Sequence, residues 1–124
     1  MGKFVIVDAK NGVKFNLKAG NGEIIAHSEV YSSLGSCKKG IASVIKNAPI
    51  APVEDQTKEG FEKLSNPKFE VYADKKGEFR FRLRARNGQN IAASEGYTTM
   101  KACQNGIESV RKNAAEANVE RVKE

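Results

Sequence analysis

The chain has 124 residues, a length that suits one domain, and it carries a net charge of +6 with an isoelectric point near 9.4. One His and two Cys are too few for a clustered metal site or for a catalytic site built on several imidazoles. No stretch is long and apolar enough to cross a bilayer. We therefore expect a soluble cytoplasmic protein with reduced thiols, no membrane association and a basic surface compatible with anionic partners.

The sequence contains two copies of one pattern, over residues 3–54 and 68–120, and these match at about half of their positions. The second copy has one extra residue in its first turn. Each copy is near the lower size limit for independent folding, and each contributes only one Cys. The repeat therefore predicts a single domain over residues 1–124, made of two mutually dependent halves (1–58 and 68–124) that are joined by a connector (59–67) and related by a pseudo-two-fold axis.

Each copy begins with three segments typical of β-strands, separated by turns. In the first copy Asn11-Gly12 and Asn21-Gly22 are hairpin signals, because both central positions of such turns favour positive φ. Apolar and polar residues alternate between these turns, as expected for a half-buried strand. The expected strands are Lys3–Asp8, Val13–Ala19 and Ile24–Ser28 in the first copy, and Phe69–Asp74, Phe79–Arg86 and Asn90–Ser94 in the second.

The period then changes to that of an α-helix. Apolar residues recur at i, i+4, i+7 and i+11 in both copies: Cys37, Ile41, Val44 and Ala48, and then Cys103, Ile107, Val110 and Ala114. Ser32-Ser33 and Thr98-Thr99 stand where N-caps are needed. Pro49 ends the first helix, whereas Ala115 lets the second continue slightly further. A short related segment follows each helix, at residues 51–54 and 117–120, and is interpreted as a fourth strand.

Two motifs occur in both copies: Asn-Gly-x-x-Ile-x-x-Ser-Glu-x-Tyr, and Cys-x-x-Gly-Ile-x-Ser-Val-x-x-Asn-Ala. In this pattern the chain resembles the YegP-like family of small uncharacterised bacterial proteins, over nearly its whole length. The resemblance implies β-β-β-α-β units, present either as tandem repeats or as two single-repeat subunits. It further implies one antiparallel sheet in which the halves exchange their last strands, residues 53–57 and 119–122. The family brings no established activity, substrate or catalytic residue.

The strongest functional signal is a row of basic residues in the second copy. They alternate with apolar residues, so strand geometry places their charged groups on one face of the sheet. This face is a candidate for nucleic-acid or polyanion binding, with Tyr72 as a stacking ring. The alternative is a solvated sheet face whose charge is balanced by Glu70, Asp74 and Glu78. The candidate binding residues are Lys14 and Lys18 of the first copy and Arg80, Arg82, Arg84 and Arg86 of the second.

A second candidate is the Ser-Glu-x-Tyr motif that precedes each helix, because a hydroxyl, a carboxylate and a phenol could perform acid–base chemistry. Nucleophilic catalysis would need a base, and the only His, His27, is replaced by Ala93 in the other copy. We therefore expect a structural role, with Ser and Glu bonded to backbone amides near the helix start and Tyr packed on the sheet. The residues that an enzyme would use are Glu29, Tyr31, Glu95 and Tyr97.

The remaining repeated residues have packing explanations. Cys37 and Cys103 lie on the apolar helix stripe, where Cys behaves as a small buried hydrophobe, and a disulfide across the pseudo-two-fold axis is the alternative. Gly40 and Gly106 interrupt good helices, which indicates close approach of each helix to the sheet or to its partner helix.

From these patterns we predict an α+β domain of two tandem β-β-β-α-β units that is monomeric, because the repeat supplies the dimer-like arrangement internally. The leading functional hypothesis is a non-enzymatic binding or structural module with no metal and no cofactor. Nucleic-acid or polyanion binding is the alternative, and an enzyme is the second alternative. Because repeated residues are explained by the fold, residues that differ between the copies are the first place to look for function.

Overall fold

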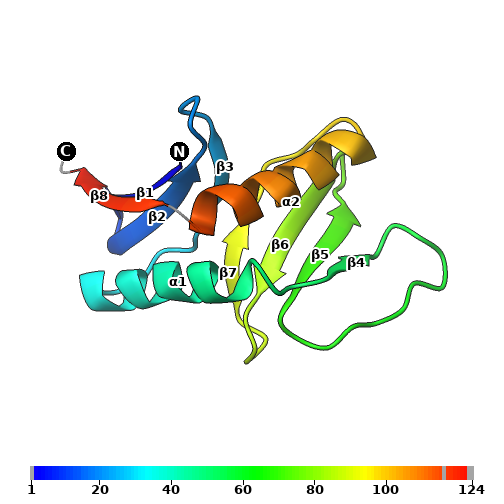
Figure 1. Cartoon of the computed structure of the whole chain (residues 1–124), viewed down its shortest axis with the longest axis horizontal. Helices are drawn as coiled ribbons and strands as arrows, with labels where there is room; N and C mark the ends of the chain where they lie inside the picture. The colour runs from blue at the N-terminus through cyan, green and yellow to red at the C-terminus, as the bar shows by residue number, and fades with distance from the viewer. Residues whose placement is uncertain (1, 116, 123–124) are drawn as a thin grey trace.

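A computed structural model of the chain describes residues 2–115 and 117–122; the outermost bounds expected for the two halves, residues 1 and 124, lie outside them. Eight strands form one sheet in the order β4-β5-β6-β7-β3-β2-β1-β8, and the two helices lie on one of its faces (Figure 1). The strands are β1 (Lys3–Ala9), β2 (Gly12–Lys18), β3 (Ile24–His27), β4 (Val53–Asp55), β5 (Lys68–Ala73), β6 (Phe79–Arg84), β7 (Asn90–Ala93) and β8 (Asn118–Val122). The helices are α1 (Leu34–Asn47) and α2 (Met100–Ala115). The α+β class and the two repeated units are thus as the sequence predicted.

The pseudo-two-fold axis passes between β3 and β7, the innermost strands. These strands pair antiparallel through His27 and Ala93, which occupy the same position in the two copies. Each half places its meander on its own side of this pair: β1, β2 and β3 on one side and β5, β6 and β7 on the other. The symmetry of the sequence is therefore a symmetry of the sheet.

The last strand of each half crosses to the other half. β4 pairs with β5, and β8 pairs with β1. Both pairs are parallel, so the expectation of a wholly antiparallel sheet was wrong at its two edges. The physical reason is that each last strand pairs with the first strand of the other half, and no hairpin joins these two strands. Residues 56–67 connect β4 to β5 and are long enough for a parallel crossover. The exchanged strands also differ slightly from expectation: β4 ends at Asp55 because the chain turns at Gln56, and β8 begins at Asn118.

The helices begin where the sequence placed them. The hydroxyl of Ser33 accepts a hydrogen bond from Ser36 N at 3.1 Å, and the hydroxyl of Thr99 accepts one from Ala102 N at the same distance. These contacts satisfy backbone N–H groups that a helix leaves without partners in its first turn. α2 has 16 residues against 14 for α1, so the helix without the proline is the longer one.

The core lies between the helices and the sheet, and the two halves fill it in the same way. Phe4 meets Phe15 edge-on at 5.6 Å between ring centroids, and Phe69 meets Phe81 edge-on at 6.0 Å. A tyrosine then stacks on the second ring of each pair at 6.3 Å: Tyr31 on Phe15 and Tyr97 on Phe81. Aromatic pairs in these geometries add to the stability that burial already provides.

The mid-helix glycines receive these tyrosines. A Cβ atom at Gly40 would lie 2.2 Å from the hydroxyl of Tyr31, and one at Gly106 would lie 2.5 Å from the hydroxyl of Tyr97. Real Cβ atoms do not approach other atoms so closely, so the glycines let the tyrosines reach the helix backbone. The predicted close approach of helix and sheet is confirmed, and its agent is the tyrosine of the Ser-Glu-x-Tyr motif.

Candidate functional site

The arginines of β6 lie on the sheet face opposite the helices, but they are already paired with carboxylates. Arg80 Nε donates to Asp74 at 2.8 Å. Arg82 Nε and Arg84 Nε both donate to the same Glu70 oxygen, at 2.5 and 2.8 Å. The guanidinium group of Arg82 also covers the ring of Tyr72, 4.5 Å from its centroid. These three arginines therefore do not present a free basic row, and the ring proposed for stacking has one face occupied.

Arg86 does not belong to this row. β6 ends at Arg84, next to an irregularity in its pairing with β7, and Arg86 is exposed in the following turn. The expected strand over 79–86 is thus too long by two residues. Its last basic residue lies beside α1, where it lines a cavity together with Lys39 and Lys46.

The lysines of the first half are set apart from the arginines. Lys14 and Lys18 lie on β2, which is separated from β6 by β3 and β7. Three strand spacings amount to about 14 Å, so the two groups flank the centre of the sheet and do not form one cluster. Neither lysine has an ion pair among the residues that the structure describes.

A buried ionic network lies at the β4–β5 edge. Lys68 Nζ is 2.8 Å from Glu54 and 3.4 Å from Glu70, and all three side chains are almost completely buried. The connector closes the network, because Leu64 N donates to Glu54 at 2.6 Å and Lys68 Nζ donates to Leu64 O at 3.1 Å. Gln56 donates a further bond to Glu54 at 2.7 Å.

This network changes the acidity of its carboxyl groups. Burial by itself raises the pKa of Glu54, but the hydrogen bonds from Lys68, Gln56 and Leu64 outweigh it and lower that pKa to about 2. Burial likewise acts upward on the pKa of Glu70, and the bonds from Arg82 and Arg84 bring it below its usual range. Both groups are held as carboxylates, as a structural ion network requires. Paired and covered in this way, they are not available as acids or bases.

The Ser-Glu-x-Tyr motifs stabilise the sheet in both halves. Ser28 Oγ accepts from Phe15 N at 2.9 Å and donates to Glu29 O at 2.8 Å, and Ser94 repeats both bonds with Phe81 N and Glu95 O. The serines therefore bond to the neighbouring strand and not, as expected, to amides at the helix start. Burial raises the pKa of Tyr31 and of Tyr97, which keeps both phenols protonated.

The thiols are equally unreactive. Cys37 and Cys103 are free and fully buried. Burial raises the pKa of Cys37, and it raises that of Cys103 to about 11. Because the thiolate is the reactive form, neither residue is suited to nucleophilic or redox chemistry. The alternative disulfide is not formed, and the residues that the structure describes include no group of three or more side chains able to hold a metal ion.

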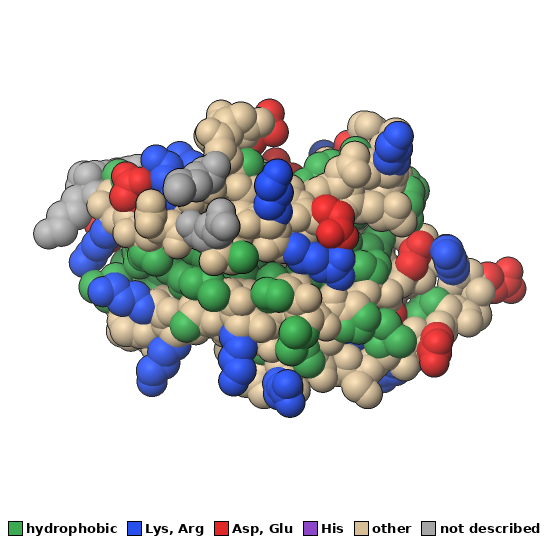
Figure 2. Space-filling model, in the orientation of Figure 1, with side chains coloured by type: hydrophobic (Ala, Val, Ile, Leu, Met, Phe, Trp, Pro, Cys, Tyr) green, Lys and Arg blue, Asp and Glu red, His purple; other side chains and the backbone are tan. Residues whose placement is uncertain are grey.

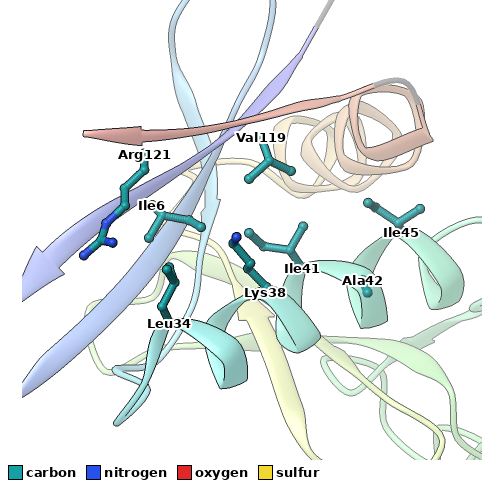
Figure 3. Close-up of a pocket in the computed structure, with 8 residues that line it drawn as sticks. All are labelled: Ile6, Leu34, Lys38, Ile41, Ala42, Ile45, Val119 and Arg121. Carbon is teal, nitrogen blue, oxygen red and sulfur yellow. The ribbon is translucent and has the colours of Figure 1, made fainter. Parts of the chain in front are cut away.

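The surface cavities lie along the flanks of the helices, and of the candidate site residues predicted from the sequence only Arg86 and Tyr31 line the cavities described below. On one flank of α1 is a groove of about 490 Å³ that we call the apolar groove. Its apolar side chains come from α1, β1 and β8 and face one another, with two cationic side chains beside them (Figure 3). Hydrophobic side chains are exposed as a band along the α1 side of the molecule (Figure 2). The groove is defined by Ile6, Leu34, Ile41, Ile45 and Val119, with Lys38 and Arg121.

On the other flank of α1 is a groove that we call the basic groove, defined by Lys39, Ser43, Lys46, Arg86 and Asn87. It consists of two adjoining cavities of about 330 and 300 Å³, which share Lys39, Ser43, Ala85 and Asn87. A comparison of the two copies position by position could have pointed to both grooves. Ile45 aligns with Arg111, Lys39 with Asn105, and Arg86 with Gly20.

The equivalent of the apolar groove in the second half is filled. Arg111 occupies the position of Ile45, donates to Ala51 O at 2.6 Å and to Glu108 at 2.5 Å, and lies 5.3 Å from the centroid of Phe69. The cavity that remains there has a volume of about 330 Å³ and is lined largely by polar residues, among them Gln104, Asn105 and Glu108. The open apolar groove is therefore found beside α1 and not beside α2, so it does not follow from the repeated fold.

The comparisons with known proteins decide the family. The family described as "Domain of unknown function (DUF1508)" matches residues 8–55 and 74–120, once for each repeat. The chain belongs to this family. It is 42% identical to the UPF0339 protein YegP of Yersinia pestis over 114 residues, which are 91% of this chain and 88% of that protein. A UPF0339 protein of Methanosarcina acetivorans is 58% identical over 52 residues, which are 42% of this chain and 90% of that protein.

Two solved structures share the fold. The solution structure of YegP from E. coli, described as a protein of unknown function, has a TM-score of 0.80 and 35% identity, with 98% of this chain and 93% of that chain covered. The solution structure of UPF0339 protein SO3888 from Shewanella oneidensis has a TM-score of 0.81 and 31% identity, with 98% and 92% covered. The suspected YegP-like membership is confirmed, and the family carries no assigned function. The Methanosarcina protein, in which this match spans 90% of the length, matches the expected single-repeat form.

Proposed function

We propose that this protein is a non-enzymatic binding module whose apolar groove binds an apolar segment of a partner protein that carries carboxylates. The observation that carries the proposal is the exchange at one aligned position. Ile45 leaves the groove open on α1, whereas Arg111 fills the equivalent place on α2. Two apolar side chains of the groove are substantially exposed, Ile45 at 37% and Val119 at 49%. Contiguous exposed apolar surface next to polar groups is typical of interaction sites.

Charge complementarity indicates the nature of the partner. Lys38 lines the groove and has no ion pair among the described residues, while Arg121 has a single long contact of 3.5 Å with Asp8. A segment that places carboxylates against these two cations and apolar side chains against Ile45 would satisfy both features. The groove lies open on the surface, and small-molecule sites bury most of their ligand, so a protein segment is the better fit.

The absence of catalysis, the monomeric state and the cytoplasmic location belong to the same proposal. The hydroxyl groups of Ser28 and Ser94 are hydrogen-bonded to the backbone, and the two thiols are buried. These observations support a binding role over a catalytic one. The repeats exchange strands within one chain, which supports a monomer. Two free cysteines are usual in a reducing compartment, which supports the cytoplasm.

The test uses two labelled peptides rich in Leu and Glu, one with helical and one with alternating apolar spacing, and matched peptides with Lys in place of Glu. We expect an acidic peptide to bind, measured by fluorescence polarisation, and the lysine peptides not to bind. The variant Lys38→Gln/Ile45→Arg copies the residues of α2 at unchanged net charge, and we expect it to lose binding while its unfolding midpoint stays close to that of the wild type. Failure of both acidic peptides to bind, or equal binding by this variant, would overturn the proposal.

A further inference from the structure

The basic groove differs from the arginine row of the sheet in the state of its charges. Arg80, Arg82 and Arg84 each contact a carboxylate. Lys39, Lys46 and Arg86 line the basic groove, and none of them has an ion pair among the described residues. Lys14 and Lys18 of the open sheet face are also unpaired in the described part of the chain, but they do not line this groove; beside α1 three unpaired cations line one cavity.

Hydrogen-bond donors accompany these cations. Ser43 Oγ accepts a bond from Asn47 Nδ2 at 3.1 Å, and its own O–H has no acceptor among the described residues and can donate to a ligand in the groove that Ser43 lines. Asn87 Oδ1 accepts from Gln89 N at 3.0 Å, so its NH₂ group is directed away from that bond, and the described part of the chain offers it no acceptor. Three cations with hydroxyl and amide donors form the set that proteins use for phosphate oxygens.

The pseudo-symmetric position beside α2 provides an internal control. The equivalent groove beside α2 has a volume of about 480 Å³, so the cavity itself follows from the fold. The charge of its lining, in contrast, differs from that of the basic groove. Lys112 remains there, but Gly20 replaces Arg86, Asn105 replaces Lys39, and the carboxylate of Glu108 lines the cavity. Of these two equivalent grooves, the basic groove alone combines several cations with no carboxylate among its described lining residues.

We infer that the basic groove is a phosphate-binding site, with Lys39, Lys46 and Arg86 contacting the phosphate oxygens and Ser43 and Asn87 donating hydrogen bonds. This site is distinct from the apolar groove, since the two linings have only Ala42 in common and none of the three cations lines the apolar groove. Phosphate can come from a nucleic-acid backbone or from a small phosphate compound. The two cavities, of about 330 and 300 Å³, have room for a phosphate group and a neighbouring sugar or second phosphate.

The experiment measures binding of a fluorescein-labelled single-stranded oligonucleotide over a range of salt concentrations, and of pyrophosphate by calorimetry. The variant Lys39→Asn/Arg86→Gly copies the residues that line the equivalent groove beside α2, Asn105 and Gly20. The control Lys101→Asn/Lys112→Asn removes the same net charge from α2, where both lysines are exposed. The logarithm of the oligonucleotide association constant falls linearly with the logarithm of the salt concentration, and each lost phosphate contact makes that slope less steep by about one. We therefore expect the slope to become less steep by about two for the first variant and to stay unchanged for the control.

Oligonucleotide binding that is weakened, with a shallower salt dependence, in Lys39→Asn/Arg86→Gly and unchanged in the control supports a nucleic-acid backbone as the source. Pyrophosphate binding with the same pattern, without oligonucleotide binding, supports a small phosphate compound. Equal weakening by both variants would show that binding follows net charge alone, and would overturn the site. Binding of neither probe at low salt would overturn it as well.

Discussion

The two edges of the sheet contain the same ion pair in opposite environments. At the β4–β5 edge Lys68 and Glu54 lie 2.8 Å apart, and their side chains are 5% and 1% exposed. At the β8–β1 edge Lys3 and Glu120 occupy the aligned positions 3.1 Å apart, with 44% and 55% exposure. The repeat supplies the pair in both halves, but only the connector, through Leu64, covers one of them. The comparison shows that one pattern of residues can serve either as a buried structural network or as a solvated surface.

Of the changes that we predict, removal of the buried lysine should have the largest effect on stability. We expect Lys68→Met to lower the free energy of unfolding by about 3–5 kcal/mol, because Glu54 is left charged and buried without its cation. The matched variant Lys3→Met should cost less than about 1 kcal/mol, because its pair is exposed. Urea denaturation measures both values.

A third variant keeps this prediction testable if Lys68→Met does not fold. Glu54→Leu/Lys68→Met removes both charges, and apolar replacement of a buried pair is often tolerated, so we expect it to regain most of the lost stability. Equal costs for Lys68→Met and Lys3→Met would contradict the difference that we draw between the two edges.

Acid should distinguish the edges by the same logic. The pKa of Glu54 is lowered from its ordinary 4.5 to about 2 in the folded protein. Its contribution, on the order of 3 kcal/mol, is therefore fully present above pH 4.5 and is lost as the pH falls from 4.5 towards 2. We expect the free energy of unfolding to decrease over this pH interval. In Glu54→Gln the decrease should be smaller.

The measurement is a set of urea titrations from pH 6 to the lowest pH at which the chain stays folded. Glu70 also has a lowered pKa, so Glu54→Gln should leave part of the acid dependence in place. A profile for Glu54→Gln that is parallel to that of the wild type throughout would show that the buried carboxyl does not drive the acid sensitivity.

Features that are repeated should, in contrast, respond equally in both halves. Gly40→Ala and Gly106→Ala each bring a Cβ against a tyrosine hydroxyl, so we expect each to cost about 1–3 kcal/mol by overpacking. Gly35→Ala is the control, since the nearest atom to its Cβ is 4.0 Å away and alanine favours the helix by up to about 1 kcal/mol. Thermal unfolding measures these changes.

Tyr31→Phe should rescue part of the loss in Gly40→Ala, because it removes the closest atom. A clear difference between the two glycine variants, or a stabilising Gly40→Ala, would mean that the two halves are packed differently around their helices.

Much of the architecture could be predicted from the sequence because the relevant interactions are local and occur twice. The caps at Ser33 and Thr99, the helix stripes and the meanders depend on residues a few positions apart. The exchange of last strands was expected only through the family resemblance, and the structure confirms it. Its parallel direction was missed, since the direction of an edge strand depends on how a crossover returns the chain.

The candidate site was predicted less well. Periodicity placed the arginines on one strand face, and Arg80, Arg82 and Arg84 do lie there. The sequence named the carboxylates that could neutralise them but not which arginine each one contacts, and Glu70 proves to pair with two of them, Arg82 and Arg84. Arg86 lies in the turn after the strand. Charge availability depends on which side chains meet across strands, and strand spacing alone does not contain that information.

The sequence by itself determined the two-fold plan of this protein, since each repeated motif satisfies a local need for a turn, a cap or a packed stripe. It also determined where to look for differences, because an alignment of the two copies places Ile45 opposite Arg111 and Arg86 opposite Gly20. Only the tertiary structure decided what those differences do. An open groove, a buried ion pair and an unpaired cation all depend on segments far apart in the chain, and only the folded sheet brings those segments together.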